Sequence, residues 1–144
     1  MPYLVGVILA LAICAFATIA GLDRDRAFYP TMTIVIASYY ALFAVMGGGT
    51  QTLVHESIGA TAFLLIAVVG FKRNLWWLVV ALAGHGIFDF IHARVIEDPG
   101  VPPWWPSFCL AFDVVAAVYL AALLLSSRLP ARTTQPGKHS SPGR

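Results

Sequence analysis

Residues 75–95, LWWLVVALAGHGIFDFIHARV, form an apolar run of about the length that a membrane-spanning helix needs. His85, Asp89 and His92 interrupt this run at spacings of four and three residues. Because each residue of a helix turns the chain by about 100°, these spacings place two imidazoles and one carboxylate on the same face. Ionisable groups at membrane depth are costly and commonly functional. The run therefore predicts both a transmembrane helix and a polar site on it.

The composition of the whole chain favours the same class of protein. Of its 144 residues 59% are hydrophobic and 11% are charged, and its mean hydropathy is +0.80, whereas soluble domains carry about 25% charged residues. The net charge is only +2, and no basic patch is interleaved with aromatic residues, so we expect no nucleic-acid partner. Cys14 and Cys109 lie in separate apolar runs, which indicates packing residues rather than a disulfide framework.

Apolar runs of similar length recur along the chain, and breaks rich in glycine, proline or charge separate them. A triple glycine at 47–49 ends the second run and precedes an expected polar turn at 50–52, and the prolines of segment 97–106 exclude helix there. We expect an all-α, polytopic integral membrane bundle (residues 1–127) with five transmembrane helices. Their expected bounds are about 2–22, 28–46, 53–71, 75–95 and 107–126. Segment 128–144 is rich in proline, serine and arginine, which predicts a disordered tail.

The distribution of basic residues predicts the orientation of this bundle. They gather in the first and third connections and in the tail, whereas the fourth connection carries Glu97 and Asp98, with Arg94 at the helix end beside it. The basic residues of those segments are Arg24, Arg26, Lys72, Arg73, Arg128, Arg132, Lys138 and Arg144. The positive-inside rule then places the N-terminus outside and the tail in the cytoplasm. No basic residue precedes the first run, which favours a retained span over a signal peptide. We expect a cell membrane location, most simply a bacterial inner membrane.

Two further acids are expected beside the helix that carries the histidines. Glu56 follows His55 near the outer end of the third span, and Asp113 lies within the fifth span. At 1.5 Å per residue, Asp89 and Asp113 lie about 10 Å below the outer boundary. By the same arithmetic His92 is shallower and His85 is deeper. Three helices thus bring ionisable groups into the outer half of the membrane, and we expect the pair Asp89 and Asp113 to be central to the site.

A metal-dependent hydrolase that acts on a lipid-like or amphipathic substrate is the first interpretation of these residues. Imidazoles and carboxylates bind Zn²⁺ and other divalent metals, so His85, Asp89 and His92 are candidate ligands. One ion does not easily take both histidines, since they lie about 10 Å apart along the helix. Glu56 and Asp113 are candidate catalytic carboxylates, because a spare carboxylate can act as a general base.

Two other interpretations remain open. In a metal-free network, His92 would pair with Asp113, or His85 with Tyr39, although such contacts in membranes contribute only about 0.6 kcal/mol each. In a binding or transport protein, a proton, ion or small molecule would occupy this face; the inner halves of the spans carry few ionisable residues to continue such a path. A structural membrane subunit and a homo-oligomer are further possibilities.

The polar residues also resemble those of small bacterial integral membrane proteins of unknown function. That group shares a glutamate that opens one helix, an H-x3-D-x2-H pattern on the next and C-x3-D on the last. The matching positions, within roughly residues 47–120, are Glu56, His85, Asp89, His92, Cys109 and Asp113. Phe88 and Ala93 stand where the group tends to have a tryptophan and a second histidine. In site composition, not in topology, the pattern is also similar to the His/Asp zinc sites of ceramidase-like membrane hydrolases.

Overall fold

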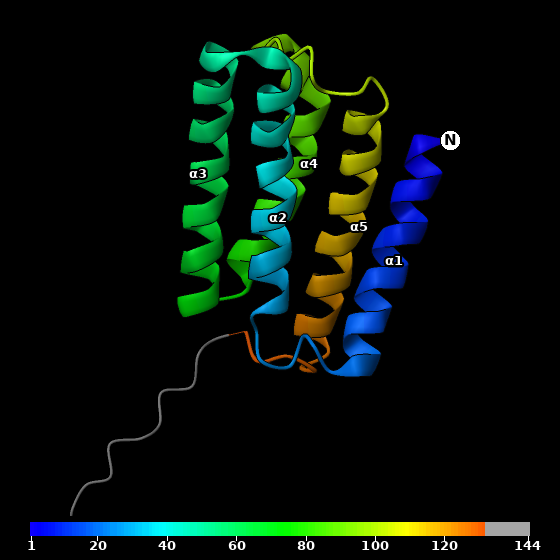
Figure 1. Cartoon of the computed structure of the whole chain (residues 1–144). Helices are drawn as coiled ribbons and strands as arrows, with labels where there is room; N and C mark the ends of the chain where they lie inside the picture. The colour runs from blue at the N-terminus through cyan, green and yellow to red at the C-terminus, as the bar shows by residue number, and fades with distance from the viewer. Residues whose placement is uncertain (132–144) are drawn as a thin grey trace, which may run out of the picture.

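The computed structural model describes residues 1–131, and this part of the chain is a bundle of long helices (Figure 1). Its elements are α1 (Pro2–Ala20), α2 (Phe28–Phe43), the π-helical turn η1 (Ala44–Gly48), α3 (Thr50–Lys72), α4 (Trp76–Val95) and α5 (Trp105–Leu125). Within the described residues, five segments are long and apolar enough to cross a membrane, with α2 and η1 forming one of them. The expected all-α class with five candidate spans is confirmed.

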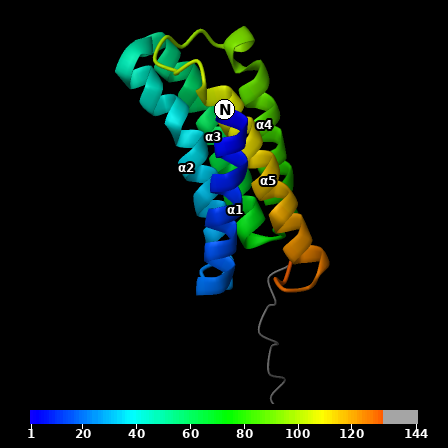
Figure 2. The same cartoon turned by 90° about the vertical axis from the view of Figure 1, so that its right-hand side faces the viewer.

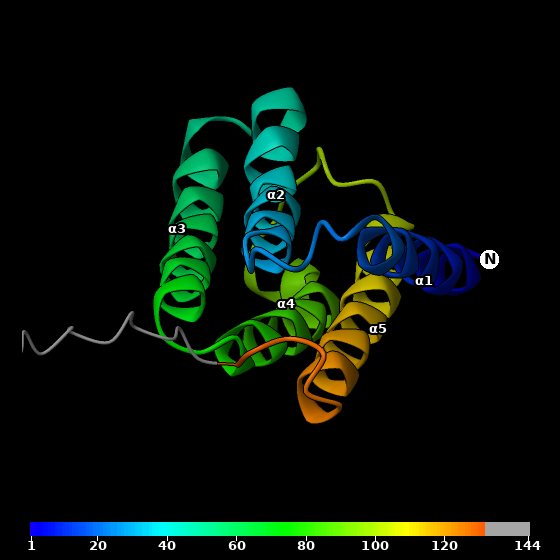
Figure 3. The same ribbon diagram turned by 90° about the horizontal axis from the view of Figure 1, so that it is seen from below.

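The helices run up and down, but they do not pack in the order of the chain. α1 packs on α5, α5 packs on α4, and α2 packs chiefly against α3, as the views in Figures 2 and 3 also show. The face of α1 that is buried against α5 consists of small residues, namely Gly6, Ala10, Cys14 and Ala17. A Cβ atom at Gly6 would lie 2.4 Å from the backbone oxygen of Phe108. The two helices therefore approach each other as closely as small residues permit.

The two ends of the bundle differ in charge. One end, called here the acidic end, carries Glu97 and Asp98 in the α4–α5 connection, and Met1 also lies there. The opposite, basic end is formed by the α1–α2 and α3–α4 connections and by the segment after α5 (Figure 1). Its described basic residues are Arg24, Arg26, Lys72, Arg73 and Arg128.

The turn between α2 and α3 at the acidic end differs from the expected one. Gly47 and Gly48 remain helical, and Gly49 alone reverses the chain at φ 85°, which favours glycine. A Cβ atom at Gly47 would lie 2.9 Å from the Cα atom of Gly100. The additional glycines thus serve close contact with the α4–α5 connection, and the expected polar turn at 50–52 is instead the first turn of α3.

Helix α5 begins two residues earlier than expected, because Pro106 is accommodated in its first turn, where a missing N–H does no harm. Trp105, expected in the loop, is therefore helical. Its ring packs against those of Tyr39 and Phe43, with centroids 5.0 and 4.9 Å away. These aromatic contacts hold the start of α5 against the end of α2.

The segment after α5 folds back on the basic end. Leu129 is 4% exposed and belongs to the apolar core, and Leu75 N–H donates to the Ala131 oxygen at 2.9 Å. The guanidinium of Arg26 donates to the backbone oxygens of Pro130 and Phe71. The expected disorder is therefore wrong for residues 128–131, because Leu129 reaches the core and Ala131 packs against it. The remainder of that expectation, 132–144, lies outside the described residues.

Candidate functional site

The polar face of α4 points into the bundle, as its spacing predicts. His85, Asp89 and His92 are 2%, 1% and 2% exposed. They do not form one group, however. The helices that surround α4 divide them into two clusters at different levels.

The first group joins α4 to α5 and is called here the His–Asp–Asp cluster (His85, Asp89 and Asp113). His85 Nδ1–H donates to Asp113 Oδ2 at 2.8 Å and lies 3.3 Å from Asp89 Oδ2. Each of the three residues offers one potential ligand atom, and these three atoms lie within 4.8 Å of one another. Asp113 is fully buried. Gly86 permits this approach, since a Cβ atom there would lie 3.3 Å from the Leu110 oxygen and 3.4 Å from Asp113 Cβ.

The second group, the His–Glu pair, joins α4 to α3. His92 Nε2–H donates to Glu56 Oε1 at 2.6 Å, and both side chains are 2% exposed. Tyr40 of α2 covers the imidazole of His92, with ring centroids 4.1 Å apart and planes 26° apart. His55, the neighbour of Glu56 in the chain, is exposed and lies outside both groups.

The predicted site residues are thus all buried, but their partners differ from those considered from the sequence. His92 pairs with Glu56 and not with Asp113, and His85 pairs with Asp113 and not with Tyr39. Asp113 therefore lies at the level of His85, the deeper histidine. The structure brings Asp89 and Asp113 together, as expected, and does not bring His92 into their cluster.

Tyr40 is the residue of the site that sequence reasoning missed. Consecutive residues of a helix point about 100° apart, so Tyr39 and Tyr40 cannot both face α4. Tyr39 is 37% exposed, whereas Tyr40 is 2% exposed and shares the inward face of α2 with Thr33 and Ile36. The spacing of Tyr40 from those two residues is the signal that identifies it.

Aromatic rings separate both groups from the surroundings. Phe63 lies edge-on to His85 at 4.7 Å between centroids, and Phe88 lies edge-on to His92 at 5.5 Å. Such an apolar shell lowers the local dielectric constant and strengthens every charge interaction inside it.

Several buried oxygens of the site have no hydrogen-bond partner among residues 1–131. They are both carboxylate oxygens of Asp89, Oδ1 of Asp113 and the hydroxyl of Tyr40. Buried polar atoms are nearly always paired, and an unpaired buried carboxylate is costly. One imidazole and two carboxylates form a donor set for a divalent cation, and three protein ligands leave coordination positions open for other groups. The chemistry of the His–Asp–Asp cluster therefore fits a metal ion.

A pocket of about 360 Å³ lies at the acidic end. It is lined by His92 and by the α4–α5 connection, including Glu97, Asp98 and Pro103. Polar molecules can thus approach His92 from that end of the bundle.

No protein-family model, curated protein or solved structure matches this chain.

Proposed function

We propose that the five helices cross a cell membrane, most simply a bacterial inner membrane, with the acidic end outside. The argument is the charge difference between the two ends of the bundle, since basic residues are retained on the cytoplasmic side. Arg26 and its basic neighbours then lie in the cytoplasm, and the pocket that reaches His92 opens outward. The candidate site belongs to the outer half of the membrane in this orientation.

We further propose that the His–Asp–Asp cluster binds one divalent metal ion, Zn²⁺ or a similar first-row metal. The observation that carries this proposal is the convergence of three ligand atoms, together with the second oxygens (Oδ1) of Asp89 and Asp113, which have no hydrogen-bond partner among the described residues. Metal binding requires His85 Nδ1 to release its proton. Asp113 becomes a ligand in this assignment, in place of the catalytic role expected from the sequence. His92 is left out of the ligand set, because its Nε2 is bonded to Glu56.

The reaction that fits this arrangement is hydrolysis of an ester or amide bond in a lipid-like substrate. A bound divalent metal would supply Lewis-acid activation of the carbonyl group and of water. Glu56 fixes the orientation of His92 through Nε2, which leaves Nδ1 as the basic nitrogen. At the cluster, Oδ1 of Asp89, which has no hydrogen-bond partner among the described residues, takes one proton from the attacking water as the water oxygen bonds to the acyl carbon. It returns that proton to the leaving oxygen or nitrogen as the acyl C–O or C–N bond breaks. His92 lies about 10 Å from His85 along α4, so its Nδ1 binds the polar headgroup of the substrate rather than the reacting water.

Elemental analysis of the purified protein tests the metal proposal. We expect stoichiometric divalent metal in the unmodified protein and loss of most of it in Asp89→Asn and Asp113→Asn, because each substitution removes an anionic ligand while keeping the side-chain shape. Glu97→Gln is the matched control, since this exposed acid lies outside the cluster, and it should retain the metal. Absence of stoichiometric metal, or full retention in His85→Ala, contradicts the proposal.

One observation favours a second, non-catalytic function. The cluster is almost fully buried, and the pocket at the acidic end reaches His92 rather than His85. A cation or proton that binds within the bundle, or passes through it, needs no room for a substrate. Ion flux into proteoliposomes without turnover of any lipid ester would support this function, whereas ester hydrolysis that Asp89→Asn abolishes would exclude it.

A further inference from the structure

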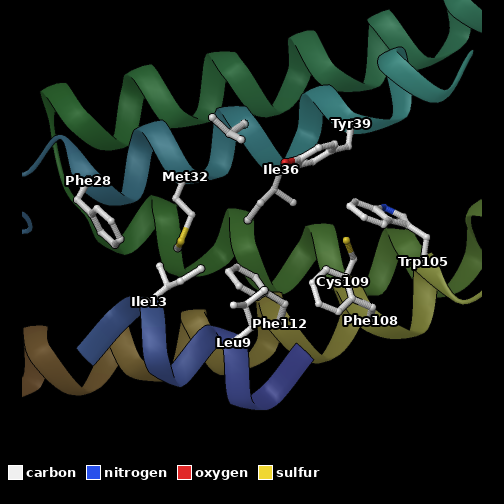
Figure 4. Close-up of a pocket in the computed structure, with 11 residues that line it drawn as sticks. Leu9, Ile13, Phe28, Met32, Ile36, Tyr39, Trp105, Phe108, Cys109 and Phe112 are labelled. Atoms are coloured by element: carbon white, nitrogen blue, oxygen red, sulfur yellow. The ribbon is translucent and has the colours of Figure 1, made fainter. Parts of the chain in front are cut away.

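An apolar groove of about 360 Å³ runs along the bundle between α1, α2 and α5 (Figure 4). It exists because α1 packs on α5 while α2 packs on α3, so that these two neighbours in the chain stand apart. Leu9 and Ile13 of α1 form one side, and Met32 and Ile36 of α2 form the other (Figure 4). The base is α5, where the sulfur of Cys109 points across the groove toward α2.

We propose that this groove holds one hydrocarbon chain of a membrane lipid. Its walls lie within helices long and apolar enough to cross a membrane, so the medium that meets its open side is hydrocarbon. The groove runs parallel to α2 from Phe28 to Tyr39, which is about 16 Å at 1.5 Å per residue. A pocket that is long, narrow and almost wholly apolar suits an extended chain.

The two ends of the groove indicate which way the bound hydrocarbon chain points. Phe28 lies at the basic end, whereas Tyr39 and Trp105 lie toward the acidic end with their rings 5.0 Å apart (Figure 4). Tyrosine and tryptophan favour the boundary between hydrocarbon and headgroups. The headgroup of the bound lipid therefore belongs at the Tyr39–Trp105 end, which is also the end where the His92 pocket opens.

The dimensions argue against a helix of a second copy as the occupant. A helix about 10 Å across occupies on the order of 1,200 Å³ over 16 Å of its length, about three times the volume of the groove. A neighbouring helix would lie across the mouth without filling it.

Cys109 links the groove to the candidate site. Its side chain is 3% exposed and lines the groove, and the same thiol lies within electrostatic range of Asp89 and Asp113. A hydrocarbon chain in the groove would thus contact a side chain that is itself close to the His–Asp–Asp cluster. The idea that the bound lipid is the substrate rests on the proposed hydrolase function. The proposal that the groove binds a lipid does not depend on that function.

Photolabelling in nanodiscs tests the lipid site. The probe is phosphatidylcholine with a diazirine in the middle of one acyl chain, added in a small fraction to phosphatidylethanolamine and phosphatidylglycerol. We expect an adduct on Cys109, which mass spectrometry of peptides can locate. Because Cys109 lines the groove and is otherwise buried, a diazirine that labels it must lie in the groove. Absence of label on Cys109, with lipid-facing residues such as Val118 labelled, overturns the proposal.

Two adjacent residues of α1 provide a matched pair of variants. Leu9→Trp should fill the groove and remove most of the Cys109 adduct, whereas Ile8→Trp should leave it unchanged, because Ile8 is exposed and lines no part of the groove. An equal effect of both variants on the Cys109 adduct overturns the proposal. The same labelling of Asp89→Asn separates the two proposals: an adduct that persists in this variant supports the groove even if the metal assay fails.

Discussion

Glu56 shows how one side chain sets the chemistry of another within the bundle. Its carboxylate accepts the Nε2–H of His92 at 2.6 Å, and both side chains are almost fully buried. Burying an imidazole away from water costs free energy, which the hydrogen bond to Glu56 offsets. Without this acceptor the cost would remain, and the ring would lose its fixed orientation. The His–Glu pair is therefore a contact whose removal should be visible in stability as well as in activity.

Substitutions of Glu56 test this contact. Glu56→Ala should lower the free energy of unfolding by about 1–3 kcal/mol, because it leaves His92 Nε2–H without an acceptor. Glu56→Gln keeps an oxygen in place and should cost clearly less. Detergent-induced unfolding followed by circular dichroism measures both values. Equal losses for the two variants would show that the hydrogen bond contributes nothing.

The sequence identifies the residues of the site but not their partners. The four- and three-residue steps of His85, Asp89 and His92 determine which face of α4 is polar, because helical rotation is fixed. The axial position of α3 and α5 beside α4 depends on where each helix starts, and both start earlier than expected. Glu56 consequently meets His92, and Asp113 meets His85. Tyr40 was missed for a related reason, since its inward direction depends on which residues of α2 are buried.

At the scale of elements, the glycines separate into those that permit close packing and those that do not. A Cβ atom at Gly6 would lie 2.4 Å from the Phe108 backbone oxygen, whereas one at Gly84 would meet no atom of the described chain within 4 Å, apart from its own helix. Gly6 therefore sets the distance between α1 and α5. Gly84, although it adjoins His85, has no packing role of this kind.

Alanine substitutions at these two positions should have opposite effects. Gly6→Ala should cost about 1–3 kcal/mol, because a backbone atom stands in the way and α1 must shift outward. Gly84→Ala should be neutral or stabilise the protein by up to about 1 kcal/mol, because alanine favours helix more than glycine does. Thermal unfolding followed by tryptophan fluorescence compares the two. A stable Gly6→Ala protein with unchanged melting temperature would contradict the close contact.

Of the elements themselves, the five apolar runs were predictable because length and hydropathy alone identify candidate spans. The residues at which the helices begin and end were harder to predict. Pro106 reads as a helix breaker in a proline-rich segment, yet it occupies the first turn of α5. Likewise, a triple glycine predicts a long break, but only Gly49 adopts a positive φ. In both places tertiary contacts accompany the boundary: Gly47 packs against Gly100 of the α4–α5 connection, and Trp105 packs against Tyr39 and Phe43 of α2.

At the scale of the whole molecule, the proposed orientation can be measured directly. In a background with Cys14 and Cys109 replaced by alanine, Glu97→Cys and Arg73→Cys place single thiols at exposed positions of opposite ends. A membrane-impermeant maleimide should label Glu97→Cys in intact cells and Arg73→Cys only after permeabilisation. The reverse pattern would place the acidic end and the His92 pocket in the cytoplasm.

The contact between α1 and α5 also constrains how the chain matures during its synthesis. The small-residue face of α1 has its partner on a helix that the ribosome completes about a hundred residues later. If the helices insert into a membrane as proposed, Gly6 and Ala10 face lipid or an insertion factor until α5 has been made. Asp113, the fully buried member of the cluster, enters with the same late helix. Assembly of the bundle and completion of the His–Asp–Asp cluster are thus a single, final event. A chain interrupted before α5 would lack Asp113, the hydrogen-bond acceptor of His85, and in the proposed membrane setting it would be a target for quality-control proteases.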